Sequence, residues 1–151
     1  MAATLSHLPH RVAPAPRRSL TLIFTAIALG LLHHTDHALR ADHSGWPFQP
    51  QVTPFSFSLL VYPVFLVALL VRARPLWSAA LCAAILALTQ YSHIVFELPT
   101  DQYATWAIGA SQDAHSLHQP NLLHLASPVL GIAAVMLSIT LSLVLFASII
   151  S

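Results

Sequence analysis

The chain has 151 residues, of which 56% are hydrophobic and only 7% are charged, with a formal net charge of +1. A water-soluble domain with a mean hydropathy of +0.72 would expose large apolar patches, so the composition predicts an integral membrane protein instead. The six arginines are distributed over both halves of the chain and form no basic surface, which excludes nucleic acid as a partner.

The sequence predicts an all-α protein, a four-helix transmembrane bundle. Its apolar segments cover about 19–38, 55–71, 76–96 and 122–150, after a tail over 1–18. Each segment is close to the roughly 20 residues that cross a bilayer as a helix. Pro63 interrupts the second segment, where neighbouring helices can satisfy the carbonyl that proline leaves free. The fourth segment is overlong, and its first residues are expected to form a turn before Pro128.

Arginine placement predicts the orientation of these segments. Five of the six arginines lie before the first segment or between the second and third, and only Arg40 lies elsewhere. Because arginine-rich loops face the cytoplasm, both termini are expected there. The absence of lysine indicates a GC-rich coding bias, which is consistent with the plasma membrane of a bacterium. Eight of the ten histidines then fall on or near the outer face. An alternative interpretation treats the first segment as a signal sequence that begins at Arg17 and Arg18, but no small-residue cleavage box precedes the histidines.

The end of the first segment carries the most distinctive residues of the chain, His33-His34-Thr35-Asp36-His37, followed by Asp42 and His43. The spacing of four places His33 and His37 on one helix face, and Asp36 follows His33 by three residues. Polar groups at this depth cost free energy next to lipid unless they bind something. The run therefore indicates a ligand-binding face at the outer end of the helix.

Two other segments direct polar side chains toward the same end. In the third segment His93 and Glu97 are four residues apart, and in the fourth His124 precedes a strip of small residues that allows close helix packing. The sequence thus predicts a metal site with His33, His37, His93 and His124 as ligands. Asp36 and Glu97 are expected to act as ligands, as partners that orient a ligating histidine, or in proton transfer.

Imidazole combined with carboxylate favours zinc or iron, with copper as a further candidate. Short loops leave little room for a substrate, which favours an accessory subunit or metal carrier of a membrane complex, completed by a partner or by a homo-oligomer. Two alternatives stay open, namely a membrane metalloenzyme (a hydrolase or oxidase) at the outer lipid interface and a bis-histidine haem electron carrier.

A simpler interpretation needs no ligand. Histidines at a membrane end often lie in the headgroup layer, with Asp36 and Arg40 forming an ion pair. His93 and Glu97 would then hold two helices together by a hydrogen bond. The single cysteine, Cys82, lies in an apolar stretch and is expected to be a small buried hydrophobe.

Overall fold

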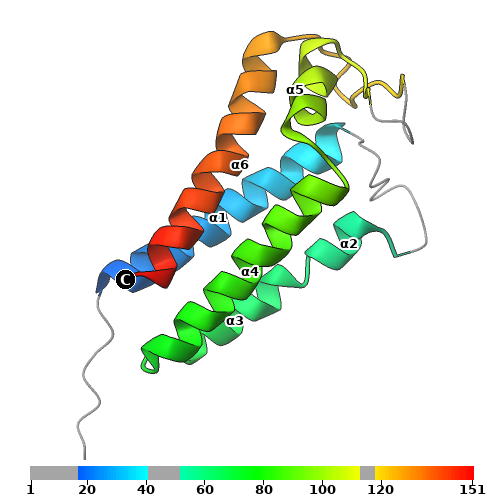
Figure 1. The fold of residues 1–151 in the computed structure, drawn as a ribbon. Helices are drawn as coiled ribbons and strands as arrows, with labels where there is room; N and C mark the ends of the chain where they lie inside the picture. The colour runs from blue at the N-terminus through cyan, green and yellow to red at the C-terminus, as the bar shows by residue number, and fades with distance from the viewer. Residues whose placement is uncertain (1–16, 41–51, 113–117) are drawn as a thin grey trace, which may run out of the picture.

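The computed structural model describes residues 17–40, 52–112 and 118–151, and within these ranges the regular elements are helices. They are α1 (Arg17–Arg40), α2 (Pro54–Ser58), α3 (Val61–Leu70), α4 (Pro75–Val95), α5 (Pro99–Ala107) and α6 (Pro128–Ile149) (Figure 1). The predicted all-α class is confirmed for this part of the chain. Most of the predicted tail, together with Asp42 and His43, lies outside the described residues.

Proline determines where four of the helices begin. Pro54, Pro75, Pro99 and Pro128 each lie at the start of a helix, where a missing N–H breaks no helical hydrogen bond. Ser127 caps α6, because its side-chain oxygen accepts the third backbone N–H of the helix. The predicted fourth segment is therefore helical only from residue 128, and its first residues form the expected turn.

The predicted second segment is not one continuous helix. It is divided into α2 and α3 by a tight turn in which the N–H of Tyr62 donates to the carbonyl of Leu59 over 3.1 Å. Pro63 explains this turn, because its ring would clash with the carbonyl four residues earlier, which is that of Leu59. The break leaves α2 and Ser58 close to the C-terminal end of α1, where Ser58 contacts His34.

Helix α5 lies in a stretch that the sequence predicted to be a loop. Its residues are mainly polar, and the side chains that it buries include Gln102, Thr105 and Trp106. The helix is stabilised by packing on α6 at Gly131, where an added Cβ would lie 2.7 Å from the carbonyl oxygen of Tyr103. Glycine is required there, since any side chain would push the two helices apart.

The long helices run in alternating directions (Figure 1). The start of α1, the turn between α3 and α4, and the end of α6 lie at one end of the molecule, and α5 lies at the other. Helix α1 packs on α3 and α6, and α4 packs on the same two helices. The core between them includes Ile23, Phe65, Leu145 and the free Cys82, all fully or almost fully buried. Cys82 is thus the buried small residue that the sequence predicted.

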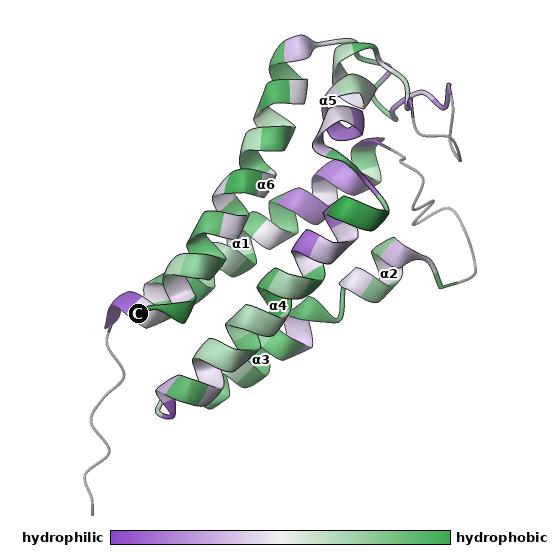
Figure 2. Cartoon of the chain, in the orientation of Figure 1, coloured by the Kyte–Doolittle hydropathy of each residue, from purple (hydrophilic) through white to green (hydrophobic). Residues whose placement is uncertain are grey.

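Two of the four predicted spans meet the length and hydropathy that a membrane crossing needs, namely α4 and α6. Only 17% and 22% of their apolar windows are buried, so both helices present most of their apolar surface outward. The structure therefore supports two candidate spans. Polar residues in the last turns of α1, and the break between α2 and α3, keep the other two segments from meeting the same criteria. Figure 2 shows hydrophilic residues gathered where the ends of α1 and α4 meet α5.

Candidate functional site

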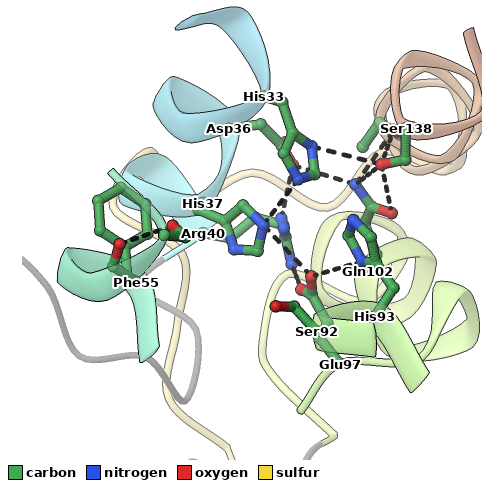
Figure 3. Close-up of polar contacts among 12 residues, drawn as sticks. His33, Asp36, His37, Arg40, Phe55, Ser92, His93, Glu97, Gln102 and Ser138 are labelled. Carbon is green, nitrogen blue, oxygen red and sulfur yellow. Dashed lines mark hydrogen bonds and ion pairs between the residues drawn. The ribbon is translucent and has the colours of Figure 1, made fainter. Parts of the chain in front are cut away.

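Three of the predicted histidine ligands lie together between α1 and α4 (Figure 3). His33 and His37 project from one face of α1, as their spacing predicts, and their Nε2 atoms are 3.0 Å apart. The ring of His93, from α4, lies with its centre 5.1 Å from that of His33. Tertiary packing of two helices thus brings three imidazoles into one cluster.

Glu97 completes this cluster from the residues that follow α4. Its side chain is only 3% exposed. The Oε2 atom lies 3.5 Å from Nε2 of His37 and 3.8 Å from Nδ1 of His93, and it has no hydrogen-bond partner within the described residues. The other oxygen, Oε1, accepts a hydrogen bond from Nη1 of Arg40. One carboxylate oxygen is therefore buried and directed at two imidazoles.

Asp36 has a different role from the one expected of a ligand. Its Oδ1 accepts the indole N–H of Trp106 over 2.7 Å, and its Oδ2 accepts from Nε of Arg40 over 2.8 Å and from Gln102 over 3.3 Å. Both oxygens are thus occupied by donors from α1 and α5. As placed, Asp36 joins these two helices and orients Arg40, and the Asp36–Arg40 ion pair of the simpler interpretation is present.

Arg40 links the two carboxylates at the centre of the site. Its side chain is fully buried, and it forms ion pairs with both Asp36 and Glu97. With neutral histidines, two buried carboxylates face a single guanidinium, so the buried cluster carries one net negative charge. Burying uncompensated charge is costly. A bound cation or a protonated imidazole would remove this imbalance.

Two polar residues from other helices hold His33 in place. Ser138, on α6, has its hydroxyl 3.4 Å from Nδ1 of His33, and it accepts a hydrogen bond of 2.9 Å from Gln102 on α5. A proton on Nδ1 directed at Ser138 leaves the lone pair on Nε2, which faces His37. The sequence prediction missed Gln102 as a partner. Ser138 gave a signal only as a member of the small-residue strip on α6.

The neighbouring His34 belongs to a separate network. Its Nδ1 lies 2.9 Å from the carbonyl oxygen of Gly30 and 2.8 Å from the hydroxyl of Tyr62, and its Nε2 lies 2.9 Å from the hydroxyl of Ser58. Both of its ring nitrogens therefore have partners within α1, α2 and α3. His34 fastens these helices together and leaves the cluster to the other three histidines.

A small cavity lies beside the cluster, between α1, α2 and α4. Its polar wall includes His33, His37, His93 and Glu97, and its apolar wall includes Phe55. The cavity volume is about 60 Å³. A water molecule needs at least roughly 10–15 Å³ in such a space, whereas pockets for organic ligands begin at about 300 Å³. The space suits an ion with a few waters and is too small for haem or an organic substrate.

His124, the fourth predicted ligand, lies apart from this cavity. It is exposed in the segment between α5 and α6, has a backbone φ of 51°, and donates its backbone N–H to the carbonyl of Asn121. The prediction placed it on a helix face, but α6 begins only at Pro128. The structure therefore brings together five of the six predicted residues and leaves His124 in a surface turn.

Within residues 17–40, 52–112 and 118–151, no three His, Cys, Asp or Glu side chains are already arranged as a metal site. The pairwise spacing is nevertheless informative. Bonds of about 2.0–2.1 Å to a tetrahedral ion place neighbouring ligand atoms about 3.3 Å apart. The separations of 3.0, 3.5 and 3.8 Å among His33, His37, His93 and Glu97 lie on both sides of this value.

Comparison with protein-family models, with curated proteins and with solved structures gives no match. Function is therefore inferred from the side chains of the site and from their surroundings.

Proposed function

We propose that this chain is a multi-pass membrane protein that binds one divalent transition-metal ion at the outer end of its helices, and that it serves as an accessory subunit or metal carrier of a membrane complex. The ligands are His33, His37, His93 and Glu97. One observation carries this proposal. The buried Oε2 of Glu97 has no hydrogen-bond partner among the described residues and lies 3.5 and 3.8 Å from two imidazole nitrogens.

The charge of the cluster supports a cation. Among the described residues, Asp36 and Glu97 face one guanidinium, that of Arg40, in a region where all three side chains are largely buried. A divalent ion bound by neutral imidazoles and by Glu97 would offset the excess negative charge and give Oε2 a partner. Ser138 lies next to Nδ1 of His33. A hydrogen-bond partner on the second ring nitrogen usually orients a ligating histidine, and Ser138 supplies this partner.

The ligand types favour zinc or iron, with copper next. Three imidazoles and one carboxylate suit these ions, while copper(I) prefers sulfur, and Cys82 lies in the core away from this cavity. A cavity of about 60 Å³ has no room for haem or for an organic substrate. This favours storage, transfer or structural use of the ion over catalysis on a large molecule.

The proposal of four crossings of the bilayer rests on the length of α1 and on the placement of the arginines. Helix α1 has 24 residues and is about 36 Å long, which exceeds a hydrocarbon thickness of about 30 Å. Arg17 and Arg18 begin α1, and Arg72 and Arg74 lie in the turn before α4, at the same end of the molecule (Figure 1). The positive-inside rule assigns this end to the cytoplasm and the cluster to the outer side of a bacterial plasma membrane.

The test is metal content in detergent-purified protein and in four variants. The parent should contain about one equivalent of zinc or iron. His37→Ala and His93→Ala should each lose most of the ion, and the double variant should lose little more, because ligands of one ion act as a unit. Glu97→Gln should also lose the ion. His124→Ala is the matched control and should retain it.

Two results would overturn the proposal. One is a parent that holds far less than one equivalent after growth and purification with zinc and iron present. The other is a loss of metal that is additive between His37 and His93, or that depends on His124. Far-UV circular dichroism of each variant separates loss of the ligand from loss of the fold.

A further inference from the structure

A second, larger hollow lies on the outer face, between the end of α4 and the start of α5. Its volume is about 530 Å³, and its lining includes Glu97, Thr100, Asp101 and Gln112. We refer to it as the outer hollow. Glu97 lines both this hollow and the cavity that contains the three imidazoles, and so does Phe96. Glu97, whose buried Oε2 has no hydrogen-bond partner among the described residues, therefore lies at the boundary between the two spaces.

The charges around the outer hollow favour cations. Asp101 lies in the first turn of α5, and its Oδ1 accepts the backbone N–H of Gln112 over 3.1 Å. Glu97 and Asp36 add two more carboxylates at this end of the described chain, and Arg40 is the one guanidinium among these groups. A hollow lined by charge of one sign concentrates ions of the opposite sign.

The opposite wall of the inner cavity is unsuitable as a route for an ion. It is lined by Phe55 of α2, Val61 of α3 and Leu88 of α4. An ion that passed between these side chains would lose its hydration without gaining ligands, and such desolvation is very costly. The outer hollow is lined by both apolar and polar residues, and its polar residues Thr100, Asp101 and Gln112 supply oxygen ligands in the same hollow as Glu97.

We propose that the outer hollow is the route by which a divalent metal ion reaches the site, with Asp101 attracting the ion and Glu97 transferring it to the imidazoles. This inference rests on the proposed function. Because Oε1 of Glu97 is held by Arg40 and Oε2 faces His37 and His93, the carboxylate can bind an arriving ion while it stays in place. Asp101 acts on the rate of loading, and the four ligands determine retention.

The test measures loading and release of Zn²⁺ separately. Full-length protein stripped by a chelator is mixed with Zn²⁺ held by a chromogenic indicator, and loading is followed by stopped flow. One charge acting on a divalent ion at about 8 Å through water changes its local concentration about five-fold. Asp101→Asn, which keeps the acceptor for Gln112, should therefore load about five-fold more slowly at low salt. The difference should disappear at about 1 M salt, where charges are screened within about 3 Å.

Release into excess chelator and the final zinc content should be the same for Asp101→Asn as for the parent. Asp101→Glu should load at the parental rate. Arg74→Gln changes the net charge by one unit at the opposite end and should also leave loading unchanged. If the parent loads normally and Asp101→Asn loads equally fast at low salt, the proposed route is wrong while the metal site stands. A parent that takes up no Zn²⁺ refutes both.

Discussion

Replacing Arg40 by methionine should destabilise the protein strongly, because it leaves two carboxylates buried without their shared cation. The Arg40 side chain is fully buried, its Nε lies 2.8 Å from Oδ2 of Asp36, and its Nη1 donates to Glu97. Two charges about 4 Å apart interact by about 4 kcal/mol at an effective dielectric constant of about 20. Part of that attraction compensates the desolvation of Arg40 itself. Loss of one member of a buried ion pair costs about 3–5 kcal/mol, and this is the expected effect of Arg40→Met.

The assay is reversible unfolding in mixed micelles with an increasing fraction of denaturing detergent. With Trp46 and Trp77 replaced by phenylalanine in every variant, fluorescence of Trp106 is a suitable signal, because its indole N–H donates to Asp36 within the same network. The exposed Arg74 provides the matched control, and Arg74→Met should change the free energy of unfolding by less than about 0.5 kcal/mol.

A triple variant separates charge from packing. Arg40→Met combined with Asp36→Asn and Glu97→Gln removes the uncompensated charges and should recover more than half of the lost stability. If Arg40→Met costs less than about 1 kcal/mol, the ion pairs contribute no more than exposed ones do. The view of Arg40 as the residue that holds the two carboxylates together would then be refuted.

Three further outcomes are expected. Metal retention should fall as the pH is lowered from 8 to 5, because histidine must be neutral to bind metal, and retention that is flat over this range would contradict an imidazole site. A reporter fused to the C-terminus should be active only in the cytoplasm and one inserted at Gln112 only outside, and the reverse result would invert the membrane orientation. Gly131→Ala should reduce the free energy of unfolding by about 1–3 kcal/mol, since its Cβ would lie 2.7 Å from the carbonyl oxygen of Tyr103. Gly30→Ala should be neutral or stabilising, because its Cβ would lie 3.8 Å from the nearest side-chain atom. Equal effects of the two changes on unfolding would show that α5 does not pack closely on α6.

The local sequence determined the all-α class and contains the prolines at which four helices begin. Apolar segments of helical length predict the all-α class, and a proline at the first position marks the beginning of α2, α4, α5 and α6. Spacings of four also determined the local pairs His33–His37 and His93–Glu97, since residues four apart share one face of any helix. These features depend only on neighbours along the chain, which is why they are readable without the fold.

Contacts between distant residues were decided by the tertiary structure. The sequence allowed Asp36 to be a metal ligand. In the structure its two oxygens accept hydrogen bonds from the indole of Trp106, 70 residues later, and from Arg40. Helix α5 has no apolar segment of spanning length, so the sequence predicted a loop although Pro99 marks its start, and its packing against Gly131 is a tertiary contact. His124 shares a plausible helical spacing with α6, yet it lies in a surface turn because the helix begins at Pro128. Which donors face one another depends on how α1, α4, α5 and α6 pack, and that packing depends on the side chains of all four helices together.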